Sequence, residues 1–366
     1  MESLKAEMRE GRHLADNTIR IYCANLEKMA YAMTGERFEN MEFSREYNGI
    51  LDFLKGLTLS TIRNYVATLI VGLSPSGKNK VTEGYEEIIT KYRNFLITKN
   101  TEYTEKAKEQ KKNQKEKDNW IGLGQLEQIR VNYGKKIKKK GWNTRNLSKI
   151  YINGEPIDYK LCGTSATIEC GYDTHIGGMR LPHRRKDKTL LQKYLVASLY
   201  LLHPPRRNEY GNMKVISHKN YLKLEDNDKL KNWLVVISRN KKFFHFGNYK
   251  TFRSYGIQKV DVSKELNQVI NLCTRQDIIK ANARGDTTPP FLYNQQGGPL
   301  NTNLLTKFLY STFASTGKNI GSNMIRHIYL SEKYGKDRTL AEREADALAM
   351  GHSISTQQLN YVKVDE

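Results

Sequence analysis

Residues 350–361 read Met-Gly-His-Ser-Ile-Ser-Thr-Gln-Gln-Leu-Asn-Tyr, and no other part of the 366-residue chain is as informative. Residues 340–350 have helical periodicity, so the glycine follows a predicted helix. His352 stands directly after that glycine, and Tyr361 follows nine residues later. The chain has 22 tyrosines, and only its place after Gly-His-Ser distinguishes Tyr361. As the plainer alternative, His352 could cap a helix end and Tyr361 could be a packing residue.

Three more groups of chemically capable residues precede this stretch. Residues 204–210 read Pro-Pro-Arg-Arg-Asn-Glu-Tyr and are predicted to open a helix that runs to Met213. Residues 248–251 read Asn-Tyr-Lys-Thr and join two predicted strands. Residues 323–327 read Asn-Met-Ile-Arg-His and lie inside a predicted helix. All four groups therefore fall in the second half of the chain.

Metal and nucleotide motifs are missing from the sequence. It contains no Walker loop, no His-x-x-x-His and no acidic pair of defined spacing, so we predict neither a metal site nor a cofactor. Four residues could in principle ligate zinc, but they lack the paired Cys-x-x-Cys spacing, and ordinary buried thiols are the better interpretation. These four are Cys162, Cys170, His175 and His183.

Taken in this order, the four groups resemble the motifs of the tyrosine recombinase (phage-type integrase) family. Its members carry an arginine followed shortly by an acidic residue, a lysine in a β-hairpin, an Arg-His pair in a helix, and Gly-His-Ser followed by a tyrosine. The Pro-Pro-Arg-Arg start is most similar to the branch found in large DNA viruses and related mobile elements. The resemblance covers residues 189–366 by motif, whereas residues 15–100 match only as a helical core-binding domain.

The sequence departs from the family pattern in three places. Position 323 is asparagine where many members have the histidine of a His-x-x-Arg motif. Only five residues follow Tyr361, so we expect no C-terminal helix of the kind that many members pass to a neighbouring subunit. The interval between Lys117 and Arg206 is longer than the family needs, which implies an insertion around residues 142–188.

The resemblance implies a site-specific DNA recombinase or integrase, an enzyme that cleaves and rejoins DNA through a covalent 3′-phosphotyrosine without metal or ATP. The catalytic residues that it implies are Arg207, Lys250, Arg326, His352 and Tyr361, with Arg206, Asn323 and His327 as alternates. If the family motif is aligned on the Pro-Pro start, its arginine corresponds to Arg207. If it is aligned on the spacing to Glu209, its arginine corresponds to Arg206. We favour Arg207 and leave Arg206 open.

These residue types suit the chemistry. Arginines can clamp phosphate oxygens in a bidentate fork, which lysine cannot do. A lysine can protonate the leaving 5′-oxygen, a histidine can accept the tyrosine proton, and the tyrosine attacks phosphorus. The plainer alternatives are a salt bridge of the Arg206/Arg207 pair with Glu209, a buried ion pair for Arg326 and a structural role for His327. Lys250 also competes with other lysines for its role, namely Lys241, Lys242 and Lys259.

Composition narrows the class of protein and its partner. The formal charge is +21 and the isoelectric point about 9.6, which favours a polyanion, and double-stranded DNA is the expected partner. No apolar run is long enough to span a membrane, and residues 1–16 lack the apolar core of a signal peptide. Four cysteines in so long a chain favour a reducing compartment. We therefore expect an intracellular, DNA-associated protein, in the host cytoplasm or nucleus if it is viral.

The predicted organisation is a helical core-binding domain (1–105), a basic linker (106–118) and a catalytic domain (119–366). The fold class is thus mixed, an all-α N-terminal bundle with an α+β C-terminal domain of the DNA breaking-rejoining type. By resemblance, the two domains would form a C-shaped clamp on DNA, and four subunits would assemble on two DNA sites. The predicted helices are 17–33, 50–54, 60–73, 85–97, 120–133, 191–202, 266–280, 303–316, 322–334 and 340–350, and the predicted strands are 233–238, 243–247 and 255–262.

Basic residues away from the motifs are candidates for contacts with the DNA backbone. Arg63 lies on the predicted outer surface of the helical bundle. Residues 106–117 contain six lysines with little that could pack, and Lys111, Lys112 and Lys115 are the contacts we select there. The plainer interpretation is a solvated surface, and the lysine run at 135–140 is an alternative.

Two other functions remain open from the sequence. A type IB topoisomerase would share the chemistry but would relax supercoils as a monomer. A relative that binds DNA and has lost catalysis would account for Asn323 and the short tail.

Overall fold

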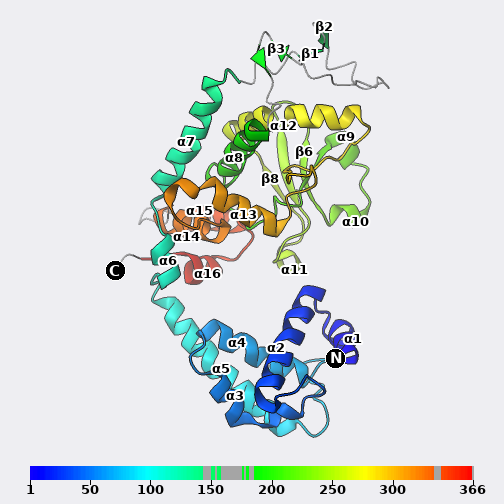
Figure 1. Ribbon diagram of the computed structural model, residues 1–366, viewed down its shortest axis with the longest axis vertical. Helices are drawn as coiled ribbons and strands as arrows, with labels where there is room; N and C mark the ends of the chain where they lie inside the picture. Colours follow the sequence, from blue (N-terminus) through cyan, green and yellow to red (C-terminus); the bar gives the residue numbers. More distant parts are fainter. Residues whose placement is uncertain are drawn as a thin grey trace. The chain divides into compact units, whose positions relative to one another are not determined.

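The computed structural model describes residues 1–142, 150–152, 155–157, 175–176, 179–180, 185–333 and 339–364 (Figure 1). Most of the expected insertion lies outside the described residues, and so do three of the zinc candidates, Cys162, Cys170 and His183. The chain divides into two compact units, Met1–Gln110 and Lys111–Glu366. The boundary falls within the lysine-rich segment 106–118.

Unit 1 consists of helices joined by turns, and its predicted helices are confirmed. The first helix, which is rich in charged residues, is not among the predicted ones, and the last helix extends well past the predicted residue 97. Apolar residues at helical spacing form one core, in which Leu26, Leu69 and Tyr92 are fully buried. The elements are α1 (Glu2–Arg12), α2 (Asp16–Thr34), η1 (Glu42–Arg45), α3 (Tyr47–Leu54), α4 (Leu59–Gly72) and α5 (Glu86–Lys108).

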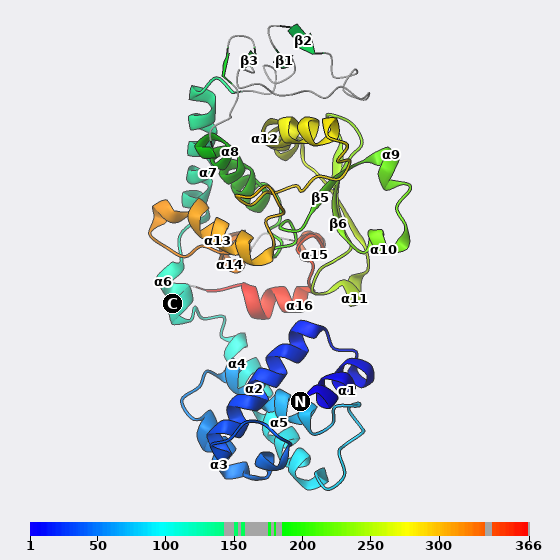
Figure 2. The same cartoon turned by 45° about the vertical axis from the view of Figure 1, so that its right-hand side comes forward.

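Unit 2 combines helices with a small mixed sheet (Figures 1 and 2). The elements before the sheet are α6 (Gln114–Asn119), α7 (Leu123–Lys139), β1 (Ile150–Ile152), β2 (Glu155–Ile157), β3 (His175–Ile176), β4 (Met179–Arg180) and α8 (Arg185–Leu201). The sheet and its connections are β5 (Lys214–Ser217), α9 (His218–Tyr221), α10 (Asp226–Lys229), β6 (Asn232–Val236), β7 (Lys242–Phe246), α11 (Phe252–Tyr255) and β8 (Gln258–Asp261). The last elements are α12 (Lys264–Ala283), α13 (Thr302–Thr312), η4 (Ala314–Thr316), α14 (Ser322–Lys333), α15 (Leu340–Ala349), α16 (Ile354–Thr356) and η5 (Gln357–Tyr361).

The sheet has the strand order β5-β6-β7-β8, with β5 parallel to β6 and the other pairs antiparallel. The three predicted strands are confirmed as β6, β7 and β8, and β5 is an addition to them. Alternation along β6 explains how the sheet packs: Leu234 joins the main core with α8 and α12, whereas Trp233 and Val235 pack beside α9. Both faces of the sheet are therefore covered, and its connections are held in place.

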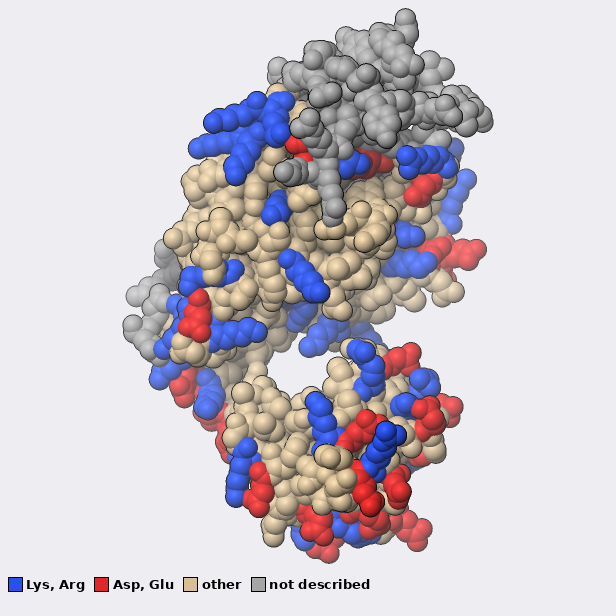
Figure 3. All heavy atoms as spheres, viewed as in Figure 1, with Lys and Arg blue, Asp and Glu red and all other residues tan. Residues whose placement is uncertain are grey.

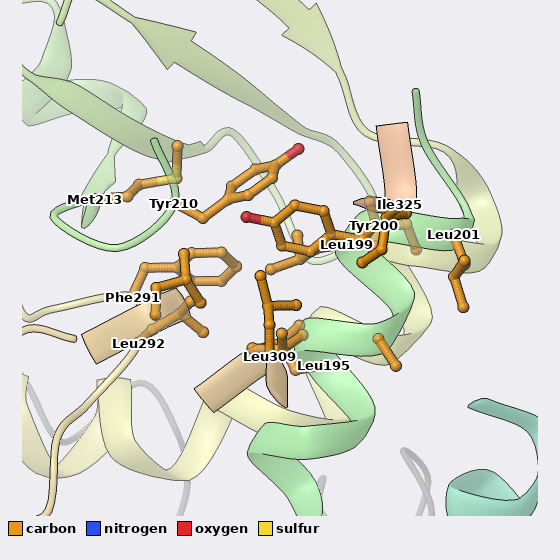
Figure 4. Close-up of a cluster of buried hydrophobic side chains, with 14 of the residues drawn as sticks. Leu195, Leu199, Tyr200, Leu201, Tyr210, Met213, Phe291, Leu292, Leu309 and Ile325 are labelled. Carbon is orange, nitrogen blue, oxygen red and sulfur yellow. The ribbon is translucent and has the colours of Figure 1, made fainter. Parts of the chain in front are cut away.

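The predicted helix from residue 204 to Met213 is wrong, because this segment forms turns. Tertiary contacts override its local pattern. Tyr210 is fully buried edge-on against Tyr200 of α8, and the Tyr200 hydroxyl donates to the Arg207 carbonyl at 2.8 Å (Figure 4). Gly211 passes so close to another segment that an added Cβ would lie 2.6 Å from the Leu300 carbonyl oxygen.

The lysine-rich segment also differs from the expectation that little in it could pack. Helix α5 ends at Lys108, and α6 begins at Gln114 after a short connection. Glu116 of α6 is buried, with 8% of its surface exposed. None of the described helices is both long and apolar enough to cross a membrane.

Candidate functional site

The Gly-His-Ser stretch ends one helix and starts the next. A Thr339–Glu342 capping box begins α15, and Gly351 after its end has a φ of 70°, in the left-handed region that favours glycine. The Ser353 hydroxyl then accepts from the Thr356 amide at 3.1 Å and caps α16. His352 is therefore fixed between a helix end and a helix start, with 2% of its surface exposed.

Tyr361 ends the π-helical turn η5 and lies against three of the predicted residues. The His352 ring stacks on the Tyr361 ring with centroids 5.2 Å apart. The Arg326 guanidinium lies 4.4 Å from the centroid of the same ring. Arg207 Nη2 donates to the Tyr361 hydroxyl at 3.1 Å. The structure thus brings together Arg207, Arg326, and His352 with Tyr361, from three stretches of the chain that are far apart in the sequence.

Arg206 and Arg326 are both fully buried and are held by backbone carbonyls near the Gly351 turn. Arg206 Nη1 donates to the Ala349 carbonyl at 2.7 Å and to Gln258 Oε1 at 2.9 Å, and its guanidinium lies 3.8 Å from the Phe246 ring centroid. Arg326 Nη1 donates to the Met350 carbonyl at 3.1 Å and to the Pro205 carbonyl at 3.3 Å. One edge of each guanidinium is therefore fixed.

The other edges of these guanidinium groups, and one nitrogen of Arg207, have no hydrogen-bond partner among the described residues. The buried nitrogens concerned are Arg206 Nε and Nη2, Arg326 Nε and Nη2, and Arg207 Nη1. Burial lowers the pKa of Arg206, and it lowers that of Arg326 to about 10, so both groups stay charged at neutral pH. Leaving buried charged donors unpaired costs free energy, which an anionic ligand with several acceptor oxygens would recover. A phosphodiester is such a ligand.

His352 is neutral and has one ring nitrogen that can accept a hydrogen bond. Burial lowers its pKa to about 3, and the neighbouring Arg326 acts in the same direction, so the ring is neutral at pH 7. Its Nδ1 donates to the Ser353 carbonyl at 3.2 Å, since a carbonyl can only accept. The proton therefore sits on Nδ1, and Nε2, which has no partner among the described residues, carries a free lone pair.

Lys250 lies in an exposed turn between β7 and α11. The next residue, Thr251, donates from its hydroxyl to the Gly351 carbonyl at 2.6 Å and so ties this turn to the site. The competing lysines lie elsewhere: Lys242 donates to Asn267, Asn271 and the Arg239 carbonyl, and Lys259 lies near Tyr221 beside α9. Lys241 is at the opposite end of β7 from Lys250.

His327 contacts the backbone of Tyr361, and Asn323 contacts His327. His327 Nδ1 donates to the Tyr361 carbonyl at 3.0 Å, and the Asn323 amide lies 3.2 Å from His327 Nε2. Within the described part of the chain, neither side chain hydrogen-bonds to the Tyr361 hydroxyl. The Glu116 carboxylate also lies close to His327, and this contact is not predicted from the sequence. The spacing of Asn113 and Glu116 does predict a capping box. A capping box, however, gives no information about contacts with distant residues.

The residues predicted to contact the DNA backbone are in varied environments. Arg63 donates to Asn100 at 2.6 Å and lies over the Tyr103 ring, so part of its guanidinium is already engaged. Lys111 and Lys115 are exposed, and Lys112 Nζ lies 4.2 Å from the Trp120 ring centroid. On the face shown in Figure 3, basic side chains also gather where α7 ends, over a last turn that contains Lys136, Lys138 and Lys139.

Comparison with known proteins adds little to this geometry. No family model matches the chain, and no curated protein matches it. Among solved structures, the chain is similar to one described as the crystal structure of XerA recombinase. The sequence identity is 9%, the match covers 100% of this chain and 94% of that one, and the TM-score is 0.31. Both the identity and the score are low, so the case for a function rests on the side chains of the site itself.

Proposed function

We propose that this chain is a site-specific DNA recombinase or integrase that cleaves and rejoins DNA through a covalent 3′-phosphotyrosine. One observation carries the proposal: buried, unpaired arginine donors lie beside a tyrosine whose hydroxyl accepts from Arg207 and whose ring stacks on His352. A phosphate held by these donors would lie next to the Tyr361 hydroxyl, with its negative charge offset by Arg206, Arg207 and Arg326.

Each side chain then has a defined part in the reaction. The Tyr361 oxygen forms a bond to phosphorus while the bond from phosphorus to the 5′-oxygen breaks, and the phenolic proton passes to Nε2 of His352. Lys250 gives a proton to the leaving 5′-oxygen. The arginines stabilise the negative charge of the transition state in both the cleavage and the rejoining reaction. Rejoining is the reverse reaction, so the bond energy is conserved and no ATP is consumed.

The finer features of the proposal come from the resemblance of the motifs. They are the viral or mobile-element branch, the assembly of four chains on two DNA sites, the clamp around duplex DNA, and the location in the cell. Each of them stays a prediction, as do the phosphate contacts assigned to Arg63, Lys111, Lys112 and Lys115.

The test is a covalent trapping experiment with a pool of nicked DNA duplexes of randomised sequence. Cleavage near a nick releases a short strand, so the protein stays attached to the DNA and can be isolated under denaturing conditions. We expect an adduct joined through Tyr361, and transfer of the trapped strand to a second duplex. Relaxation of supercoiled plasmid without strand transfer would indicate a topoisomerase, and binding with no adduct would indicate a relative without catalysis.

A further inference from the structure

Glu116 is a buried acidic residue in a segment of mostly exposed side chains. It lies in α6, where its backbone amide donates to Asn113 Oδ1 at 2.9 Å and its carboxylate accepts from the Asn113 amide at 2.9 Å. The end of α6 is also fixed, because the Asn319 amide donates to Asn119 Oδ1 at 2.7 Å. The start of the helix is therefore capped and its end is held on the rest of unit 2, so Glu116 has a defined position.

The two carboxylate oxygens of Glu116 reach one residue that holds the Tyr361 carbonyl and another that follows Tyr361 by two positions in the chain. Oε1 lies 3.4 Å from His327 Nε2, and Oε2 lies 3.6 Å from Lys363 Nζ. All three side chains are largely buried, so these interactions are only weakly screened by solvent. His327 in turn donates to the Tyr361 carbonyl at 3.0 Å, and the Lys363 amide donates to Ser331 Oγ at 2.8 Å.

The Glu116 carboxylate also affects the pKa of the His327 ring. Burial lowers the pKa of His327, and Glu116 opposes this effect by stabilising the charged form. The ring nitrogens fix the orientation of the imidazole. Nδ1 donates to the Tyr361 carbonyl, and Nε2 accepts from the Asn323 amide when the ring is neutral or donates to Glu116 Oε1 when the ring is charged. Since Nδ1 holds the backbone of the tyrosine itself, a shift of the ring would shift the Tyr361 hydroxyl.

We propose that Glu116 is a positioning residue for Tyr361, acting through His327 and Lys363. It does not touch the phosphate or the reacting atoms. It fixes the segment that carries the tyrosine, so that the hydroxyl stays beside Arg207 and the arginine donors. This inference rests on the proposed function, because it assigns Glu116 a part in DNA cleavage by Tyr361.

Glu116→Gln separates positioning from helix capping. Glutamine serves in a capping box as well as glutamate does, so the variant keeps the start of α6 and removes only the negative charge between His327 and Lys363. Asp118→Asn is the matched control, since it makes the same change of charge two residues away at an exposed position. Both variants are made in the full chain.

The measured quantities are the rate of adduct formation on nicked duplex at saturating protein, the protein concentration at half-saturation, and the melting temperature. We expect Glu116→Gln to lower the rate roughly 10- to 100-fold, because small displacements of a nucleophile have effects of this size, with the other two quantities unchanged. Asp118→Asn should match the wild type in all three. In a His327→Gln background, Glu116→Gln should cause a smaller loss than in the wild type, because only the contact with Lys363 is left to remove.

The results separate failure of this inference from failure of the proposed function. If wild-type protein forms no adduct, the proposed function fails and the role of Glu116 fails with it. If wild-type protein forms the adduct and Glu116→Gln reacts as fast as Asp118→Asn, or loses only affinity, Glu116 has no positioning role. Should Glu116→Gln not fold, Lys363→Met provides the same test, because it leaves the capping box intact and removes one of the two contacts; a wild-type rate in Lys363→Met would then overturn the inference.

Discussion

Arg326 is the residue at which the effects of side-chain charge and of side-chain geometry on DNA cleavage can best be tested separately. It is fully buried, with one edge held by two carbonyls and the other edge unpaired. Arg326→Lys keeps the charge but loses the planar fork, so we expect DNA cleavage at saturating protein to fall roughly 100-fold or more while DNA affinity changes little. Single-turnover cleavage and a binding titration measure the two effects. Normal cleavage by this variant would reduce Arg326 to a structural role.

Arg206 and Arg207 have different surroundings, and alanine substitutions should therefore have different effects. Arg207 is half-buried and contacts the Tyr361 hydroxyl, so Arg207→Ala should lower the cleavage rate and leave the melting temperature nearly unchanged. Arg206 is fully buried and holds the Ala349 carbonyl and Gln258, so Arg206→Ala should lower both. Cleavage assays and thermal melting of the two variants make the comparison. Equal, mild losses of activity would remove both residues from the catalytic set.

The sequence indicates which residues are chemically capable but not which contacts they make. Tyr361 is distinguished by its spacing after Gly351, and the structure places it against His352, Arg207 and Arg326. The sequence favours Arg207 over Arg206 but leaves the choice open, because one alignment is anchored on the Pro-Pro start and the other on the spacing to Glu209. Their different burial depends on how residues 204–213 fold, and that is decided by contacts with distant segments.

The turn that carries Lys250 joins β7 to α11 and is tied to the site by Thr251. If Lys250 is the general acid, its loss matters only for a leaving group that needs a proton. A substrate with a bridging 5′-sulfur has a leaving group that departs readily without one. Lys250→Ala should therefore cleave a normal duplex slowly and the sulfur-substituted duplex at close to the wild-type rate, in the same single-turnover assay.

Two comparisons complete this prediction. Arg326→Ala should stay slow on the sulfur-substituted duplex, because its loss affects the charge at phosphorus rather than the leaving group. Lys241→Ala removes a lysine from the other end of β7 and should behave as wild type on both substrates. If the sulfur substitution does not restore cleavage by Lys250→Ala, the general acid is another residue, with Lys259 or His352 next to be tested.

Among the elements, those with a local signal are predicted well. The strands β6 to β8 and the helices α2 and α4 have alternating or helical patterns that need no distant partner to be recognised. The segment 204–213 fails for the opposite reason, because Tyr210 is drawn into the core beside Tyr200. The packing of α6 could not be predicted either, because the partners of Glu116 lie more than two hundred residues further along the chain.

At the scale of the whole molecule, the net charge of +21 predicts salt-sensitive binding to DNA. The lysines of segment 106–117 are expected to contact phosphates without reading sequence. Neutralising Lys106, Lys108, Lys111 and Lys115 together should weaken binding equally across sequences and reduce the slope of log affinity against log salt by roughly one unit per lost contact. Titrations at several salt concentrations measure this slope.

The cleavage rate of the same variant at saturating protein should stay near that of the wild type, since these four substitutions leave Glu116 and its contacts in place. Limited proteolysis should cut the segment in the free protein and be slowed by DNA. An unchanged salt slope would mean that these lysines are only a solvated surface. The contacts would then have to come from elsewhere, and the lysines at the end of α7 are the next to be tested.

The central claim is that the Tyr361 hydroxyl is the nucleophile, and Tyr361→Phe tests it most directly. Phenylalanine keeps the ring that stacks on His352 and lies under Arg326, so folding and DNA affinity should be close to those of the wild type. The measurement is the yield of covalent protein–DNA adduct on nicked duplex under denaturing conditions. We predict an adduct with the wild-type protein and none with Tyr361→Phe. An adduct at wild-type yield in the variant would contradict the assignment of the nucleophile and, with it, the proposed function of the site.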